Sequence, residues 1–272
     1  MDTDLTIDIP SQTEDDVDET TGLRAHLRTA TLSTGVWGNL VDPRVAHAVA
    51  RADFDWVCVD QQHGYASGND VLDLIGAVRA AGTSALVRLA WNRPEEIGRA
   101  LDAQADGVIV PMVESAEEAR AAVAGTRYAP AGRRSWGGTR SPLAPTANDV
   151  AATNAASACL VMVETPAAVE RVEEIAAVEG LDGIFLGPFD LSLAYGMPIE
   201  ELIADQGEDS PLGRVVAACR RNGITAGAFA GNLDRAAALR AHGFTMLAVI
   251  SDDALVTQAS TATAAEARDR LR

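Results

Sequence analysis

Two acidic residues stand where apolar runs of the chain end, and their type and spacing suit metal chemistry. Val161–Val163 is followed directly by Glu164, and Gly183–Leu186 is followed four residues later by Asp190. An apolar run that stops at a carboxylate near a proline is typical of a buried strand ending in a polar mouth. Two carboxylates at adjacent strand ends supply the oxygen ligands that hard divalent cations prefer. The alternative is that each residue caps a helix or pairs with an arginine.

The absence of lysine narrows the possible chemistry, because all 22 basic residues of the chain are arginine. A lysine Schiff base with a carbonyl substrate or with pyridoxal phosphate is therefore excluded. If the protein acts on a carbonyl compound, a metal ion must serve as the electron sink. A cation held by Glu164 and Asp190 would keep positions for water and for a bidentate ligand such as a 2-oxo carboxylate.

Three more polar residues follow apolar runs earlier in the chain. Asp60 and His63 come at and just after the end of one run, and Arg88 ends the next. A histidine at a strand end is suited to act as a general base, with Asp60 or another carboxylate orienting its ring, and a structural histidine is the alternative. Because an unpaired buried guanidinium is unfavourable, Arg88 is expected to bind a carboxylate ligand or to pair with Asp60.

These residues need a scaffold that brings strand ends together, and the sequence predicts a single-domain α/β fold, the (β/α)8 TIM barrel. Apolar runs alternate with longer alanine-rich amphipathic stretches, as in successive βα units, and the C-terminal ends of barrel strands converge on one face. No glycine-rich nucleotide-binding turn follows a predicted strand, which disfavours a doubly wound sheet. The predicted strands are 32–37, 55–60, 84–89, 107–111, 159–164, 182–186, 224–229 and 245–250. The predicted helices lie near 43–52, 68–81, 94–104, 115–126, 166–178, 211–222, 232–242 and 252–270.

Composition limits the partners of the protein. The chain has 272 residues, 47% of them hydrophobic, which suits one large domain. A formal net charge of −17 disfavours nucleic acid and anionic membranes as partners. No signal peptide and no apolar run of membrane-spanning length is recognisable. We interpret the three cysteines, Cys58, Cys159 and Cys219, as reduced thiols in the core, so a cytoplasmic protein is expected.

The charge is concentrated at the N-terminus, where the first twenty residues hold eight acidic residues and no arginine. Residues 1–22 are therefore predicted to form a disordered acidic tail, and residues 23–272 the catalytic barrel domain. A long segment, 128–150, is expected on the same face as the strand ends, where loops carry specificity. In it, Arg134 and Trp136 are candidates for contacts at the rim of the site, with solvated surface residues as the alternative.

Several motifs together resemble the HpcH/HpaI aldolase/citrate lyase family, the class II, metal-dependent pyruvate aldolases. The resemblance runs from about residue 30 to about residue 260. The motifs that carry it are Asp60-Gln61-Gln62-His63, Arg88, Leu101-Asp102, Val108–Pro111, Tyr128–Arg134, Val163-Glu164-Thr165 and Gly187–Ser192.

The resemblance implies a divalent metal, Mg²⁺, Mn²⁺ or Co²⁺, bound by Glu164 and Asp190 and chelated by the carboxylate and 2-oxo oxygens of pyruvate. Arg88 would contact the same oxygens, and His63 would work with a carboxylate at the position of Asp102 as the base system. The implied or candidate substrate-binding residues are Gln62, Arg88, Arg134, Trp136, Met162, Gly187, Pro188 and Phe189. Gln62, Ser135 and Met162 differ from residues common in the family, which leaves the aldehyde half of the site less defined than the pyruvate half.

The sequence thus predicts a lyase that reversibly cleaves a 4-hydroxy-2-oxo acid to pyruvate and an aldehyde through a metal-stabilised enolate. A CoA-ester lyase or a 2-oxo acid decarboxylase could use the same site, and a non-catalytic sensor of 2-oxo acids is a further alternative. Asp102 ends the helix that follows Arg88, and that end points away from the catalytic face. A homo-oligomer, either a hexamer or a dimer-based assembly, is therefore expected, in which a neighbouring subunit supplies Asp102.

Overall fold

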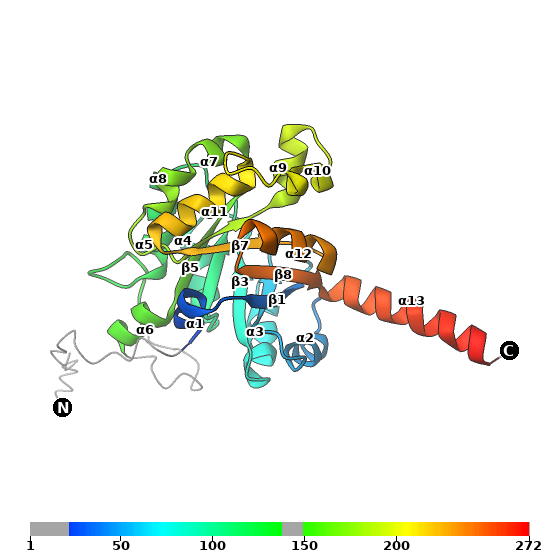
Figure 1. The fold of residues 1–272 in the computed structure, drawn as a ribbon. Coiled ribbons are helices and arrows are strands. Elements are labelled where there is room, and N and C mark those ends of the chain that lie inside the picture. Colours follow the sequence, from blue (N-terminus) through cyan, green and yellow to red (C-terminus); the bar gives the residue numbers. More distant parts are fainter. Residues whose placement is uncertain (1–21, 138–148, 272) are drawn as a thin grey trace, which may run out of the picture.

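Eight parallel strands close into a barrel in chain order, with β8 pairing with β1 (Figure 1). The computed structural model describes residues 22–137 and 149–271. The predicted (β/α)8 barrel is confirmed, and each of its strands begins and ends within one residue of the prediction. The strands are β1 (Ser33–Gly38), β2 (Trp56–Asp60), β3 (Ser84–Arg88), β4 (Gly107–Val110), β5 (Ala158–Val163), β6 (Gly183–Leu186), β7 (Thr225–Phe229) and β8 (Met246–Ser251).

The helices depart from the prediction in two ways. First, the stretch 166–178 forms two short helices that meet at Arg171. Second, the sequence does not predict α1, α6, α9 and α10. One of these, α9, is mostly apolar around its whole circumference, so the periodicity that identifies an amphipathic helix is weak there. The helices of the described residues are α1 (Leu23–Thr29), α2 (Pro43–Ala50), α3 (Asp70–Ala80), α4 (Pro94–Asp102), α5 (Ala116–Thr126), α6 (Val150–Ala156), α7 (Pro166–Glu170), α8 (Val172–Ala176), α9 (Pro188–Tyr195), α10 (Ile199–Ala204), α11 (Pro211–Asn222), α12 (Leu233–His242) and α13 (Asp252–Arg270).

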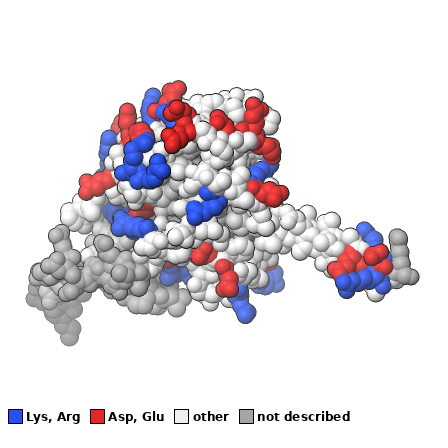
Figure 2. All heavy atoms as spheres, in the orientation of Figure 1, with Lys and Arg blue, Asp and Glu red and all other residues white. Residues whose placement is uncertain are grey.

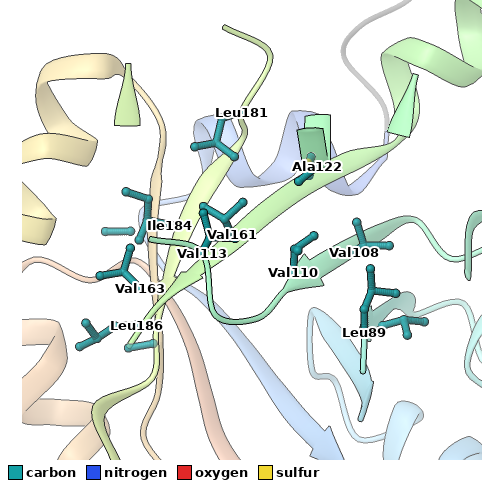
Figure 3. Close-up of a cluster of buried hydrophobic side chains, with 14 of the residues drawn as sticks. Leu89, Val108, Val110, Val113, Ala122, Val161, Val163, Leu181, Ile184 and Leu186 are labelled. Atoms are coloured by element: carbon teal, nitrogen blue, oxygen red, sulfur yellow. The ribbon is translucent and has the colours of Figure 1, made fainter. Parts of the chain in front are cut away.

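The strands divide the hydrophobic core into two layers. Alternate residues face the helices, as Val161, Val163, Ile184 and Leu186 do in Figure 3. The residues between them face inward and form the inner cluster, which fills the barrel. The inner cluster comprises Leu23, Leu27, Trp37, Trp56, Cys58, Leu86, Ile109, Ala158, Leu160, Met162, Phe185, Met246 and Ala248.

The N-terminal end of the barrel is closed by α1, whose Leu23 and Leu27 belong to the inner cluster. Charged groups join the starts of the strands there. Asp182 accepts hydrogen bonds from Arg24 Nε at 2.6 Å and from Arg127 Nη2 at 3.3 Å, and its side chain is fully buried. This end is therefore sealed, and the opposite, C-terminal end is the open mouth.

The last helix, α13, projects away from the barrel (Figure 1). Its N-terminus is fixed because the buried carboxylate of Asp252 accepts hydrogen bonds from the backbone N–H groups of Asn39 and Leu40. Charged side chains gather at the helix tip, whereas the stretch 254–265 carries none (Figure 2). Among the described residues, no helix has the length and apolar character needed to cross a membrane.

Candidate active site

The two-residue period of the strands places three of the predicted site residues in the barrel mouth. Asp60 follows inward-facing Cys58 by two positions, Arg88 follows Leu86, and Glu164 follows Met162. Asp60, Arg88 and Glu164 are 1%, 7% and 2% exposed, respectively. The barrel therefore buries two carboxylates and one guanidinium at its C-terminal end, where β2, β3 and β5 stop.

Asp60 and Arg88 form a bidentate ion pair, as one of the two sequence interpretations expected. The residues are register partners on β2 and β3, and Arg88 donates from Nε to Oδ1 at 2.8 Å and from Nη2 to Oδ2 at 2.5 Å. Trp37 Nε1 also donates to Oδ2 at 3.2 Å, and its ring lies 5.0 Å from the Arg88 guanidinium carbon. Burial raises the pKa of Asp60, but the hydrogen bonds and charge of Arg88 outweigh it and hold the pKa below its ordinary value.

The second buried carboxylate, Glu164, has no such cationic partner among the described residues. Its Oε1 accepts a hydrogen bond from the backbone N–H of Met112 at 2.7 Å, and Met112 adopts a left-handed φ of 55° to present that group. Burial raises the pKa of Glu164, and the negative charge of Asp190 raises it further, while Met112 and the charge of Arg88 oppose the rise. Asp190 is exposed in the first turn of α9, so the two carboxylates share the mouth.

This arrangement fits a divalent cation. A buried carboxylate near a second carboxylate is unfavourable unless a positive charge lies between them. The described residues contain no cluster of three or more histidine, cysteine or acidic side chains that could hold a metal ion. A cation site on Glu164 and Asp190, which stays a prediction from the sequence, would therefore have two protein ligands, and water and substrate oxygens would complete the coordination.

The loop after β2 places His63 at the mouth, with its side chain exposed. The contact of His63 with Asp60 is made by the backbone: its N–H lies 3.4 Å from Asp60 Oδ1. Asp60 therefore does not orient the His63 ring, because its oxygens bind Arg88, Trp37 and the backbone N–H of Gln62. A carboxylate from elsewhere would have to do so.

The described parts of the segment 128–150, residues 128–137 and 149–150, do not lie at the mouth, and for them the expectation that the segment shares the catalytic face is wrong. The segment leads from the end of α5 to α6, which is followed by β5, and the connection from one barrel helix to the next strand runs at the N-terminal end of a barrel. Arg134 donates its backbone N–H to the carbonyl of Arg127, which in turn is bound to Asp182 at the sealed end. Neither Arg134 nor Trp136 is thus brought to the mouth of its own barrel, and residues 138–148 lie outside the described part.

Asp102 also lies away from the mouth, as expected. It is the last residue of α4, its side chain is 46% exposed, and Arg134 Nη2 donates to its Oδ1 at 2.7 Å. The candidate base system, His63 and Asp102, is therefore split between opposite ends of one barrel.

One side of the mouth is aromatic, which the sequence interpretation missed except for Phe189. Trp37 packs against Phe185 and Phe229 with ring centroids 5.4 Å apart in each case, and Phe189 lies 5.8 Å from Phe229. Met162 is buried beside them in the inner cluster. The inward positions of β1 and β7, once assigned by their two-residue period, could have identified Trp37 and Phe229.

Comparison with known proteins decides the family. The HpcH/HpaI aldolase/citrate lyase family matches residues 33–259. The chain belongs to this family. It is 32% identical to the 2-dehydro-3,6-dideoxy-6-sulfogluconate aldolase of Pseudomonas putida over 82% of this chain and 87% of the relative. It is 37% identical to a 4-hydroxy-2-oxovalerate aldolase of Novosphingobium aromaticivorans, over 74% and 78% of the two chains.

A solved HpcH/HpaI family structure from Burkholderia cenocepacia J2315 superposes with a TM-score of 0.81 at 30% identity, over 90% of this chain and 98% of the other. The structure of the citrate synthase SbnG superposes with a TM-score of 0.79 at 26% identity, over 92% and 98% of the chains. Both of these curated relatives are named as aldolases, and this member of the HpcH/HpaI family is accordingly a carbon–carbon lyase.

The backbone at Gly187 gives a test of how Glu164 is held. A Cβ atom at this position would lie 2.6 Å from Glu164 Oε2, closer than such atoms are found. Gly187→Ala is therefore expected to displace the carboxylate and to weaken Mn²⁺ binding, measured calorimetrically, by about tenfold or more. Gly76→Ala is the control, since a Cβ atom there meets nothing within 4 Å. Equal Mn²⁺ affinity in both variants would contradict this view of the site.

Proposed function

We propose that the protein is a divalent-metal-dependent aldolase that reversibly cleaves a 4-hydroxy-2-oxo acid to pyruvate and an aldehyde. The observation that carries the proposal is the pair of buried carboxylates in the mouth, of which Asp60 is neutralised by Arg88 and Glu164 is not. A site with one unneutralised buried carboxylate beside Asp190 is suited to a cation. The aldolase names of the curated relatives support the same reaction class.

Glu164 and Asp190 would hold Mg²⁺, Mn²⁺ or Co²⁺. When bound, the cation supplies the positive charge that stabilises negative charge developing on the C2 oxygen of the substrate. Because two ligands come from the protein, the carboxylate and 2-oxo oxygens of the substrate can occupy neighbouring positions.

The other groups of the mouth bind the pyruvate half. Arg88 uses Nε and Nη2 on Asp60, and none of the hydrogen bonds among the described residues involves its Nη1, which is left to contact the 2-oxo or carboxylate oxygen. The backbone N–H groups at Phe189 and Asp190, in the first turn of α9, favour the substrate carboxylate through the helix dipole. Gln62, Gly187 and Pro188 complete this half of the site.

His63 is assigned as the base. Its exposed ring at the mouth would take the proton of the C4 hydroxyl, the O–H electrons would form the aldehyde carbonyl, and the C3–C4 electrons would form the enolate of pyruvate. Return of a proton to C3 would complete pyruvate. The aromatic side of the mouth, with Trp37, Phe229 and Met162, favours an apolar aldehyde substituent.

We further propose that the protein works as a homo-oligomer, a hexamer or a dimer-based assembly, in which Asp102 of one copy reaches His63 of another. Three observations support this. Asp102 and His63 lie at opposite ends of their own barrel, and α13 presents the uncharged stretch 254–265 to solvent. An apolar groove between α2 and the root of α13, lined by Val49, Phe54 and Val256 among others, offers a surface for a second copy.

Removal of either acidic ligand tests the cation site. Glu164→Gln and Asp190→Asn should each weaken Mn²⁺ binding at least tenfold, because each removes half of the protein's charge at the cation. Calorimetric titration measures the affinity, and chelation of the wild-type protein should abolish pyruvate release from a 4-hydroxy-2-oxo acid until Mg²⁺, Mn²⁺ or Co²⁺ is restored. Unchanged affinity in both variants would mean that the cation lies elsewhere.

Subunit mixing tests the shared site. His63→Ala should reduce cleavage by about 10²–10⁴, and Asp102→Asn should also be impaired. Mixed under conditions that exchange subunits, the two variants should regain activity, since some interfaces pair an intact His63 with an intact Asp102. No recovery despite exchange, shown by differently tagged chains in one particle, would disprove the shared site.

A further inference from the structure

Arg134, which is buried at the sealed end of the barrel, binds one oxygen of the half-exposed Asp102 carboxylate. The Arg134 side chain is 1% exposed, whereas the Asp102 side chain that it binds is 46% exposed. Arg134 Nη2 lies 2.7 Å from Asp102 Oδ1. The pair thus joins a buried arginine to a half-exposed carboxylate.

The chain around Arg134 is anchored to the barrel. The Arg134 backbone N–H donates to the Arg127 carbonyl at 2.8 Å, and Arg127 Nη1 donates to the carbonyl of Ser157 at 2.7 Å, next to the start of β5. The Arg134 guanidinium carbon also lies 4.7 Å from the centre of the Tyr128 ring. Arg134 therefore approaches Asp102 from a rigid base rather than from a solvated loop.

Stability alone explains this arrangement poorly. Burial lowers the pKa of Arg134, and its Nε is buried without a hydrogen-bond partner among the described residues. An ion pair with a half-exposed carboxylate contributes little to folding, so it does not offset burial of a guanidinium well. Asp102 is also the last residue of α4, where the helix dipole disfavours a negative charge. The pair is therefore better explained by a need to keep this carboxylate in one place.

We propose that Arg134 is a positioning residue of the base system, which fixes Asp102 in the orientation that a neighbouring copy's His63 requires. The inference rests on the proposed shared site and assigns Arg134 a role through Asp102 of its own chain. A carboxylate that orients a histidine ring must be held within a few tenths of an ångström to be effective. Arg134 provides that restraint from its buried position at the N-terminal end of the barrel, with no contact to the substrate.

Each proposed site combines Arg134 and Asp102 of one copy with His63 of the neighbouring copy. Mixing variants of different residues therefore shows which residues act from the same copy. Arg134→Met removes the charge with similar volume. Mixed with His63→Ala under exchange conditions, it should regain activity in about a quarter of the sites, because each site combines His63 of one copy with the Arg134–Asp102 pair of the next. Mixed with Asp102→Asn, it should regain none.

Arg134→Met alone should lower the turnover of the aldol reaction by about tenfold or more, because the base is displaced. The KM for pyruvate, measured in the direction of aldol addition, should stay unchanged. Arg134→Lys keeps the charge and should retain more activity than the methionine variant. If Arg134→Met does not fold, Arg134→Lys takes its place in the mixing experiment. Arg79→Met is the matched control: Arg79 pairs with Asp106 at another helix end, and its loss should leave turnover unchanged.

The outcomes distinguish a failure of the role of Arg134 from a failure of the shared His63–Asp102 site. If His63→Ala recovers with Asp102→Asn but not with a folded, assembled Arg134 variant, Arg134 does not act through Asp102 and the inference is wrong. Wild-type turnover in Arg134→Met also overturns it. If neither mixture recovers despite exchange, the shared site itself fails and the role of Arg134 with it.

Discussion

A strand of a closed barrel can turn only every second side chain inward, and this constraint determines the chemistry available to the protein. On β2, β3 and β5 the inward series ends with Asp60, Arg88 and Glu164. Because the strands are parallel and in register, the three side chains meet in one mouth while hydrophobic groups fill the barrel below them. A shift of one residue in any of these strands would turn its polar end toward the helices and dismantle the site.

The two buried carboxylates of the mouth are in opposite electrostatic situations, and the difference gives each a function. Asp60 is neutralised by a forked contact with Arg88, so it serves to orient that guanidinium. Glu164 has a backbone hydrogen bond and the negative charge of Asp190 near it, so under the proposed function a cation would neutralise it. In the proposed reaction, Arg88, oriented by Asp60, would contact the substrate oxygens, and Glu164 and Asp190 would hold the cation that stabilises their negative charge.

The sequence predicts the strands and the mouth residues because both depend on local alternation, which is visible in one chain. It does not predict the face on which a long segment lies: the length of the segment 128–150 suggests a specificity loop at the mouth, whereas its described residues 128–137 lie toward the N-terminal end of the barrel. The direction of the chain would have corrected this, since the segment leads from a helix to a strand. The Arg134–Asp102 contact joins residues 32 positions apart on different elements, and no periodicity reveals it.

In the proposed reaction, this mouth stabilises a pyruvate enolate only when a divalent cation is bound. Proton NMR of pyruvate in deuterium oxide measures it directly, since each enolate formed exchanges a methyl proton for deuterium. Exchange is expected with the Mn²⁺- or Mg²⁺-loaded protein. It should be lost with EDTA and in Glu164→Gln, and it should recover when metal is returned to the wild-type protein. Exchange that persists after the metal is removed, or no exchange by the metal-loaded protein, would contradict the proposed function.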